Sequence, residues 1–412
     1  MPTEYLKTTV CIVGAGPSGT ATSLTLAKMG IPHVIVDAAD FPRDKICGDG
    51  IDLKVIRVLN HIDPSIVQNE LPVSPFFSAS MGMRFILPNG KQVEVMADKN
   101  GSSVYQHPVF YVSKRKEFDQ FLFGKINRQL ADVHTGTRIE KMERTGDTWL
   151  LHGKKGMADI TIETKLVVGA DGDHSVVLKH VGERKVQREH YAAAVRQYWK
   201  DIDGMHDQKL IEIYFPASLP FSYFWIFPLN NKEANVGYGM ASNHVAKKNV
   251  NVRQAFEELI RTDPYMAQRF KRAQPLETTK GWGVPMATLN RQAHGDGWLL
   301  VGDAASLVCP TSGEGIGTGM LSGYIASLYI QRAVQQQNYS AAMFSTYDRE
   351  LHKRLKQEEK LYRMINRMPD VIFTTGLNFF LSSPLFKKWY TRKEMPRWLD
   401  TAFDRPINVN FS

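Results

Sequence analysis

The fold is decided near the N-terminus by the stretch Thr9-Val10-Cys11-Ile12-Val13-Gly14-Ala15-Gly16-Pro17-Ser18-Gly19. The apolar residues before Gly14 predict a buried parallel strand, and residues 20–29 predict the helix that follows it. Gly14 permits a tight turn, Gly16 lets the backbone approach a pyrophosphate, and Gly19 lets the helix pack on the strand. The phosphates would then lie at the positive N-terminus of that helix. The stretch therefore predicts a dinucleotide-binding βαβ unit.

A carboxylate follows at the distance that such a unit requires. Asp37 closes the apolar run Val34-Ile35-Val36, about twenty residues beyond the glycines, and would lie at the tip of the second strand. There it can accept hydrogen bonds from a ribose diol. A glycine-rich turn in an unrelated α/β protein would need neither the preceding strand nor this acid, so the combination favours a dinucleotide site.

Two distant segments favour FAD over NAD. Lys165–Gly172 is an apolar strand that ends in Gly-Ala-Asp-Gly, and Gly297–Ala305 is another that ends in Gly302-Asp303. Pro310–Gly317 then leads into a long helix of small residues. We expect Asp303 to hold the ribityl chain or the inner ribose. The N–H groups of Gly315–Gly317 would face the pyrimidine edge of the flavin and stabilise its reduced, negatively charged form. An NAD-binding site would have no use for this third segment, residues 297–317.

With these segments in order, the chain resembles the FAD-dependent oxidoreductases built like aromatic hydroxylases and, within them, the geranylgeranyl reductase family. The match spans most of residues 5–340. Lys45–Gly50 looks like the Cys-Gly-x-Gly loop that lies beside the isoalloxazine in that family. Arg115–Asp119 matches an Arg-x-x-Phe-Asp pattern whose arginine contacts FAD. Val133 looks like the position whose backbone meets the adenine.

The same resemblance covers Tyr223-Phe224-Trp225-Ile226-Phe227-Pro228, which fits the family's Tyr-x-Trp-x-Phe-Pro substrate-cavity motif. Side chains alternate along a strand, so Tyr223, Trp225 and Phe227 share one face. On the functional interpretation this face lines an elongated apolar cavity suited to a polyprenyl chain. A strand buried on both sides in an ordinary core would carry the same pattern, so the residues alone leave both interpretations open.

Cys47 is the candidate catalytic residue. It follows a basic stretch that includes Arg43 and Lys45, which would favour a thiolate if the side chain were partly exposed. Alternatively, it is a small residue where the backbone passes close to the flavin. Reduction of an alkene needs a proton as well as a hydride, and Cys47 or a water could supply it.

We expect an α/β fold with a Rossmann-like FAD-binding domain, an inserted, mainly antiparallel β domain for substrate, and a C-terminal helical segment. The FAD-binding domain would comprise residues 1–75, 105–185 and 282–345, the substrate domain 76–104 and 186–281, and the helical segment 346–412. Residues 83–95 predict a hairpin with Asn89-Gly90 at its turn, and residues 252–273 a helix broken at Pro264. The expected cofactor-binding residues are Gly14, Gly16, Pro17, Ser18, Gly19, Asp37, Cys47, Gly48, Gly50, Arg115, Val133, Asp303, Gly313, Gly315, Ile316 and Gly317.

Composition is that of a cytoplasmic enzyme. The 412 residues carry a net charge of +9 with mixed signs, and no nucleic-acid-binding module is present. The three cysteines indicate no disulfide framework, and the spacing of the histidines indicates no metal site. We find no signal peptide and no membrane-spanning run. Aromatic and basic residues at 373–393 suit either a lid over the substrate domain or a peripheral contact with the inner face of a membrane, and an apolar helical stripe favours the lid.

The predicted function is reduction of carbon–carbon double bonds in a prenyl or other apolar lipid by hydride transfer from reduced FAD. NAD(P)H or another reductant would supply the electrons, although the sequence contains no second dinucleotide motif. A flavin monooxygenase acting on an apolar or aromatic substrate is one alternative. Halogenation is disfavoured, because halogenases carry Trp-x-Trp-x-Ile-Pro where this chain has Tyr223 and Phe227. A non-catalytic or electron-shuttling flavoprotein is the other alternative.

Overall fold

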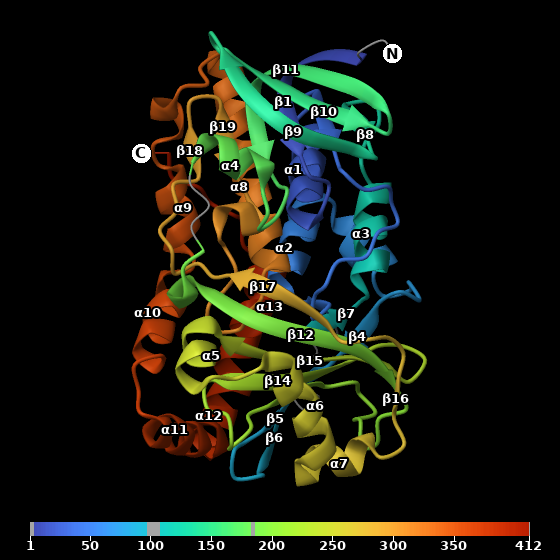
Figure 1. Cartoon of the computed structure of the whole chain (residues 1–412), viewed down its shortest axis with the longest axis vertical. Coiled ribbons are helices and arrows are strands. Elements are labelled where there is room, and N and C mark those ends of the chain that lie inside the picture. The colour runs from blue at the N-terminus through green and yellow to red at the C-terminus, as the bar shows by residue number, and fades with distance from the viewer. Residues whose placement is uncertain (1–3, 97–107, 183–185, 412) are drawn as a thin grey trace.

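The computed structural model describes residues 4–96, 108–182 and 186–411, so parts of the domain ranges assigned above, residues 1–3, 97–107, 183–185 and 412, lie outside the described residues. Two large sheets lie one above the other, toward opposite ends of the long axis of the molecule (Figure 1). The upper sheet is built around parallel strands and the lower sheet is mainly antiparallel, with C-terminal helices along one side. The predicted α/β fold with a second, mainly antiparallel sheet and a helical C-terminal segment is confirmed.

The upper sheet has the strand order β18-β19-β11-β1-β2-β8, in which β19, β11, β1, β2 and β8 are parallel. Residues 10–13 are almost completely buried in a core that they share with residues of the neighbouring helices and of β9 and β10, which explains their unbroken apolar run. Strands β9 and β10 extend the first half of β11 as an antiparallel meander. The strands are β1 (Glu4–Val13), β2 (His33–Val36), β8 (Ala131–His134), β9 (Thr137–Thr145), β10 (Thr148–Lys155), β11 (Ala158–Gly169), β18 (His294–Gly295) and β19 (Trp298–Leu300).

Helices α1 (Pro17–Lys28) and α8 (Ile316–Gln336) pack closely against each other beside this sheet. A Cβ on Gly323 would collide with the Ser18 carbonyl, and the Ser327 hydroxyl donates to the Thr22 carbonyl at 3.2 Å. The small residues of α8 therefore allow the N-terminal ends of both helices to reach the same region of the molecule.

A middle layer joins the two sheets. It contains α2 (Leu53–Ile62), α3 (Arg115–Gly124) and a three-stranded sheet of β3 (Gly50–Ile51), β7 (Phe110–Val112) and β4 (Ser78–Ser80). Helix α4 (Val176–Val181) instead packs on β9 and β11 of the upper sheet. The Asp52 carboxylate caps α2 by accepting the N–H of Lys54 at 2.9 Å. The apolar faces of α2 and α3 share one core with β3, β7 and the last helix of the chain.

The lower sheet has the order β16-β12-β15-β14-β13-β5-β6, with β17 also paired to β12 and with β13 parallel to β5. The hairpin of β5 and β6 turns at Asn89-Gly90, as predicted, and Gly90 has a left-handed φ of 80°. The strands of the lower sheet are β5 (Gly82–Ile86), β6 (Gln92–Met96), β12 (Tyr191–Lys200), β13 (Ile211–Tyr214), β14 (Ser222–Pro228), β15 (Glu233–Ala241), β16 (Gln274–Pro275) and β17 (Lys280–Pro285).

One face of the lower sheet is covered by α5 (Ser242–Lys248), α6 (Val252–Thr262) and α7 (Pro264–Phe270). The predicted break at Pro264 is confirmed. Proline cannot continue α6, and Asp263 caps α7 by accepting the N–H groups of Tyr265 and Met266, both at 3.1 Å.

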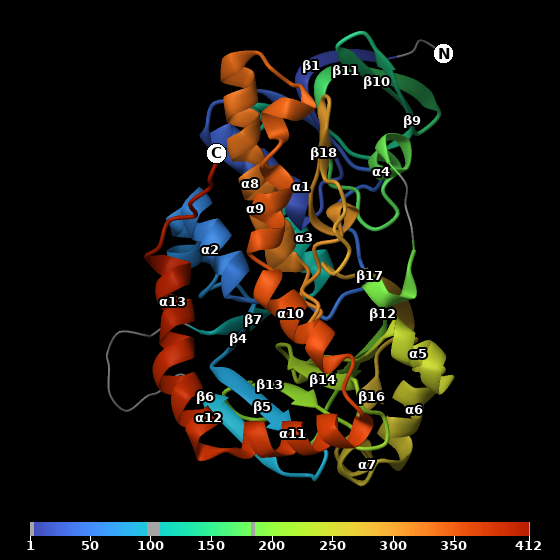
Figure 2. The same ribbon diagram turned by 90° about the vertical axis from the view of Figure 1, so that its left-hand side faces the viewer.

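The C-terminal helices run down the molecule, cross beneath the lower sheet and return upward beside α2 (Figure 2). They are α9 (Tyr347–Lys353), α10 (Lys356–Ile365), α11 (Asp370–Ser382), α12 (Pro384–Trp389) and α13 (Met395–Phe403). Among the described residues, no helix has both the length and the apolar character needed to cross a bilayer.

Candidate cofactor and substrate site

The glycine turn after β1 has the geometry that the motif requires. Gly14 has a left-handed φ of 104°, and its N–H donates to the Val36 carbonyl at 2.7 Å. A Cβ on Gly19 would collide with the Gly14 carbonyl. Gly16 differs, because a Cβ there would meet only the side-chain tip of Arg43 at 3.2 Å, and Gly16 lines a large cavity. Gly14 and Gly19 are thus needed for the packing of the protein's own backbone, whereas Gly16 leaves room for a ligand.

Asp37 connects the glycine turn to the tip of β2. Its carboxylate accepts the N–H of Ala15 at 2.8 Å and the N–H of Ala39 at 2.9 Å, and it lines the same cavity. A carboxylate offers about four lone-pair positions, so two remain for the hydroxyls of a ribose. Pro17 and Ser18, at the start of α1, line the cavity beside it. No side chain caps α1, so its first N–H groups are available to a phosphate.

An ion cluster forms the next part of the wall. Arg115 donates from Nε and Nη2 to Asp119 at 2.6 and 2.8 Å, and Arg43 donates to the same carboxylate at 2.9 Å. Both arginines line the cavity. Arg43 Nε also lies 3.8 Å from Asp37 Oδ1, so two carboxylates face the two guanidinium groups. The guanidinium N–H groups at the cavity suit a pyrophosphate. Arg115 belongs to the Arg-x-x-Phe-Asp pattern, whereas Arg43 belongs to no recognised motif, so the sequence predicts a cofactor contact for Arg115 alone.

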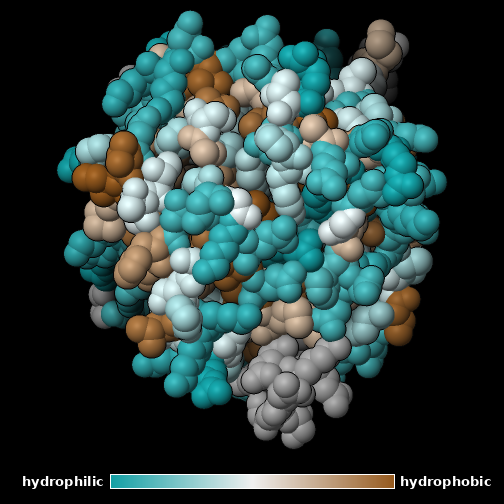
Figure 3. Space-filling view, turned by 90° about the horizontal axis from the view of Figure 1, so that it is seen from below, coloured by the Kyte–Doolittle hydropathy of each residue, from teal (hydrophilic) through white to brown (hydrophobic). Residues whose placement is uncertain are grey.

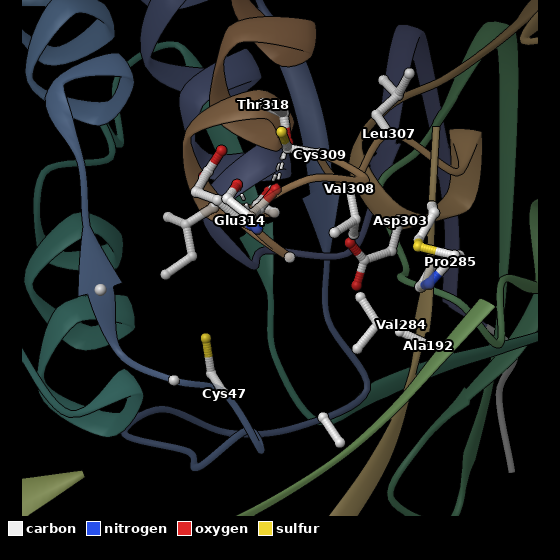
Figure 4. Close-up of a pocket in the computed structure, with 18 of the residues that line it drawn as sticks. Cys47, Ala192, Val284, Pro285, Asp303, Leu307, Val308, Cys309, Glu314 and Thr318 are labelled. Carbon is white, nitrogen blue, oxygen red and sulfur yellow. Dashed lines mark hydrogen bonds between the residues drawn. The ribbon is translucent and has the colours of Figure 1, made fainter. Parts of the chain in front are cut away.

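The two acidic strand ends have different roles. Asp303 lies in the turn Gly302–Ala305 after β19, faces the cavity (Figure 4), and pairs with Lys45 Nζ at 3.0 Å. Asp171 also borders the cavity, but its carboxylate accepts the N–H of Val176 at 2.6 Å at the start of α4. Asp171 therefore holds a helix in place through Oδ2, while its buried Oδ1 has no hydrogen-bond partner among the described residues. Asp303 presents its carboxylate to the cavity beside Lys45, and we expect it to be the main acid for a ligand.

The N-terminus of α8 differs in part from the prediction that the N–H groups of Gly315–Gly317 all face the flavin. Gly313, Gly315 and Ile316 line the cavity, but the Gly317 N–H donates to the Glu314 carboxylate. The reason is that Glu314 folds back over the first turn of its own helix. Gly317 is therefore not a direct donor to a ligand in this arrangement.

Glu314 belongs to a charged group that sequence analysis missed. Lys54 Nζ lies 3.1 Å from Asp52 Oδ2 and 3.2 Å from Glu314 Oε2, and all three residues line the cavity. Burial and the neighbouring Asp52 carboxylate raise the pKa of Glu314. The only sequence signal was a glutamate between two glycines, and its partners lie some 260 residues away.

Asp49 organises the Cys-Gly loop. It has a left-handed φ of 64° and is fully buried. Its Oδ2 accepts hydrogen bonds from the Tyr198 hydroxyl at 2.6 Å and from Asn235 Nδ2 at 2.8 Å. Burial raises the pKa of Asp49 to about 6, against the opposing effect of these hydrogen bonds. Asn235 also donates to the Cys47 carbonyl at 2.8 Å, so strands β12 and β15 of the lower sheet hold this loop.

The predicted thiolate character of Cys47 is wrong. Burial raises the pKa of Cys47, with the Arg115 guanidinium opposing this effect and the Asp49 carboxylate adding to it. The basic residues before it do not activate it, because Arg43 pairs with Asp119 and Lys45 pairs with Asp303. The Cys47 thiol thus favours its protonated form and lies in the cavity wall (Figure 4), next to Gly48, which packs against Trp225 and Phe227 of the aromatic strand.

The aromatic strand β14 divides its side chains between two environments. Tyr223, Trp225 and Phe227 line the cavity. Phe224 and Ile226 point the other way, into the core beneath α6 and α7. Tyr223 donates to the Ser312 carbonyl at 2.8 Å, which joins this strand to the loop before α8. One face of this strand therefore lines the cavity, and the other belongs to an ordinary core.

Neighbouring glycines make room for these rings. A Cβ on Gly237, on strand β15, would fall inside the ring of Trp225, and a Cβ on Gly50 would lie 3.2 Å from Phe227. Gly48 faces both rings, with Trp225 Nε1 3.6 Å from a Cβ at that position. The Cys-Gly loop and the aromatic strand thus pack directly against each other.

A single cavity of about 1420 Å³ connects these parts. We call the wall formed by Gly14, Gly16, Asp37, Arg115 and Asp303 the cofactor cradle. We call the part lined by Tyr223, Trp225 and Phe227, with Phe373 and Leu377 of α11, the aromatic chamber.

Two further predicted site residues lie away from this wall. Gly19 contacts the protein's own backbone, and Val133 pairs with Ile35 between β8 and β2. Within the described part of the chain, no three histidine, cysteine or acidic side chains gather as a metal site would require.

Comparisons with known proteins agree with the cradle. The family model described as FAD binding domain matches residues 7–360. A digeranylgeranylglycerophospholipid reductase from Methanocaldococcus jannaschii is 28% identical over 369 residues, covering 88% of this chain and 87% of that protein.

Solved structures share the fold. The crystal structure of a geranylgeranyl bacteriochlorophyll reductase-like protein from Thermoplasma acidophilum superposes with a TM-score of 0.77 at 21% identity, covering 97% of this chain and all of that one. A flavin-dependent brominase gives a TM-score of 0.72 at 18% identity, with coverage of 97% and 94%. Fold alone therefore does not select the reaction.

Proposed function

The chain belongs to the FAD-binding-domain family, and from this premise we propose that it is an FAD-dependent reductase that saturates carbon–carbon double bonds in a polyprenyl lipid. One observation carries the proposal: the cofactor cradle and the aromatic chamber are parts of one cavity, which the C-terminal helices line on the side away from the cradle. The names of relatives, among them a reductase of digeranylgeranylglycerophospholipids, support this substrate class.

The cradle fits FAD on its own geometry. Gly16 leaves the backbone open to a pyrophosphate, Arg115 and Arg43 offer guanidinium N–H groups, and Asp37 and Asp303 offer acceptors for hydroxyl groups. When bound, reduced FAD supplies a hydride. The remaining tasks fall to the chain itself, which must align the alkene, exclude water and provide a proton.

Cys47 is the residue that we assign to the proton. Hydride addition to one alkene carbon requires a proton at the other. Because burial raises its pKa, the Cys47 thiol keeps its proton at neutral pH. It lies in the loop that packs on Trp225 and Phe227, where a prenyl chain would pass. Solvent water would then restore the proton.

The aromatic chamber would orient the chain. Its lining is apolar and elongated, and it continues from β14 to α11, which suits an extended isoprenoid. NAD(P)H or another reductant would supply the electrons. We also propose that the protein works at the inner face of a membrane, where such lipids reside.

The test is incubation of FAD-loaded protein with a geranylgeranyl glycerolipid and dithionite in the absence of oxygen, followed by mass spectrometry. We expect the lipid to gain hydrogen in pairs. A lipid that is unchanged under these conditions but gains an oxygen atom in air would show a monooxygenase. Unchanged lipid in both cases, with tightly held FAD, would indicate an electron-shuttling or non-catalytic flavoprotein.

A further inference from the structure

Helix α11 is apolar on two faces. On its inner side Phe373 and Leu377 line the cavity, and Phe373 stacks on Phe221 with ring centroids 4.4 Å apart. Residues 371–386, which cover most of α11 and the start of α12, contain no charged side chain. A helix with large apolar side chains on opposite faces is normally buried on both, yet this one lies at the edge of the molecule.

The outer side of α11 and α12 is exposed to solvent. Phe379 is 80% exposed, Val371 73% and Leu385 77%. Ile372 and Phe379 are seven residues apart, so they lie on one stripe along the helix. Figure 3 views the molecule from below, the side on which α11 lies in Figures 1 and 2, and shows apolar atoms exposed among polar ones. We call this surface the outer apolar face; its residues are Val371, Ile372, Phe379, Phe380, Leu385 and Trp389.

Basic side chains border the outer apolar face. Residues 384–398 contain five lysines and arginines and one acid. That acid, Glu394, is buried, and Arg397 lies 3.4 Å from it. The border therefore presents mainly positive charge; its exposed members are Lys387, Lys388, Arg392, Lys393 and Arg397. Apolar side chains inserted between basic ones are what an anionic lipid surface binds.

We propose that the outer apolar face docks on an anionic lipid bilayer, with α11 at the level of the headgroups. Lipid could then pass from the bilayer into the chamber beneath the same helix, because the inner side of α11 already lines that chamber. A second copy of the chain fits less well, since a two-fold contact through this face would bring two basic borders together. The route of the lipid rests on the proposed function, whereas docking itself does not.

Vesicle sedimentation tests the docking. We use FAD-loaded protein with vesicles of phosphatidylglycerol and phosphatidylcholine, and with vesicles of phosphatidylcholine alone. Wild type should bind the anionic vesicles more tightly, and salt should weaken binding. Phe379→Glu should weaken it by about tenfold or more, because a phenylalanine no longer enters the interface. Lys387→Glu with Lys388→Glu should remove the preference for anionic lipid.

Met157→Glu is the matched control. Met157 is 84% exposed, like Phe379, but lies in the turn between β10 and β11 at the other end of the molecule. This change should leave vesicle binding as in wild type, and the melting temperatures of all variants should agree. Docking is overturned if wild type does not bind vesicles, if Phe379→Glu and Met157→Glu behave alike, or if the chain is a dimer that Phe379→Glu dissociates.

Activity measured in two media separates this inference from the proposed function. With a prenyl lipid dispersed in detergent, Phe379→Glu should turn over like wild type, because no bilayer is involved. With the same lipid in anionic vesicles, it should be slower by about the loss in binding. Vesicle binding without any prenyl reduction would leave docking standing and remove the proposed function. Reduction in detergent without vesicle binding would do the reverse.

Discussion

The cofactor cradle and the aromatic chamber belong to one cavity but are built in different ways. The cradle is made by backbone turns and charged pairs, such as the left-handed Gly14 and the contact between Asp303 and Lys45. The chamber is made by apolar rings, and its outer wall is a helix whose far side is exposed. The cradle tolerates little change in geometry, whereas the chamber relies on shape and can accept a long, flexible ligand.

The largest effect is expected at Gly19, beside the cradle, where helix α1 packs on the turn that contains Gly14. In Gly19→Ala the added Cβ would collide with the Gly14 carbonyl oxygen, so α1 must move away from the turn. We expect a loss of about 3 kcal/mol or more in the free energy of unfolding and little retained FAD. Gly124→Ala is the control, since a Cβ there meets nothing within 4 Å. Denaturant unfolding and the flavin absorbance of purified protein measure both; normal FAD content in Gly19→Ala would contradict the account.

The cradle was predictable from the sequence because its constraints are local. Gly14 and Gly16 lie in one short stretch, and Asp37 follows on the next strand, so spacing alone brings them together. The same logic placed Asp303 at the end of another parallel strand of the sheet. The hairpin at Asn89-Gly90 and the helix break at Pro264 were predictable for similar reasons.

Contacts between distant segments were not predictable. Asn235, on strand β15 of the lower sheet, donates a hydrogen bond to Asp49 in the Cys-Gly loop. The two residues are 186 positions apart in the sequence, and no motif marks Asn235. Glu314 takes the Gly317 N–H, which spacing had left for the cofactor. Lys45 looked able to activate Cys47, but it pairs with Asp303 instead. Each of these depends on where side chains meet in the folded chain.

The junction between the two regions should carry a pH dependence. Burial raises the pKa of Asp49 to about 6, above its unfolded value of about 3.9. The protonated form favours folding, so this stability is fully present below about pH 4 and is lost as pH rises through about 6. A shift of roughly two units corresponds to about 3 kcal/mol.

Asp49→Asn tests this because an amide does not titrate. The variant loses acceptor capacity for Tyr198 and Asn235, but that cost is the same at every pH. Relative to wild type, its free energy of unfolding should therefore rise by up to about 3 kcal/mol between pH 4 and pH 7. Urea unfolding at several pH values gives the difference, and two parallel curves would refute the role of Asp49.

The chamber should respond in activity more than in cofactor binding. Trp225→Ala removes a ring from the cavity wall and widens the path of the prenyl chain. A misplacement of the alkene by about 1 Å can cost on the order of a hundredfold in turnover. FAD content should stay near that of wild type, since Trp225 lies outside the cradle. Rates per bound flavin, measured with a long prenyl lipid, test this.

Phe224→Ala on the same strand is the matched control. Phe224 points into the core and stacks on Phe256 with centroids 5.5 Å apart. Its loss should destabilise the fold by about 3–5 kcal/mol, yet the surviving folded protein should keep its turnover per flavin. Equal rates in the two variants would mean that the cavity-facing ring has no special part in aligning the substrate.

The smallest of these effects is expected at the two acids that follow strands of the upper sheet, Asp303 in the cradle and Asp171 beside it. Asp303→Ala removes an acceptor that faces the cavity, and we expect FAD to bind about 1–3 kcal/mol more weakly, or up to roughly a hundredfold. Asp171→Ala should leave FAD affinity nearly unchanged and cost about 1 kcal/mol of stability, because Asp171 instead holds the start of α4 through Val176. Lys45→Ala completes the comparison, since it removes the partner of Asp303 but leaves the carboxylate. Fluorescence titration of apoprotein with FAD gives all three affinities. If Asp171→Ala weakened FAD binding as much as Asp303→Ala, the two strand ends would share one role, and the distinction drawn from their hydrogen bonds would fail.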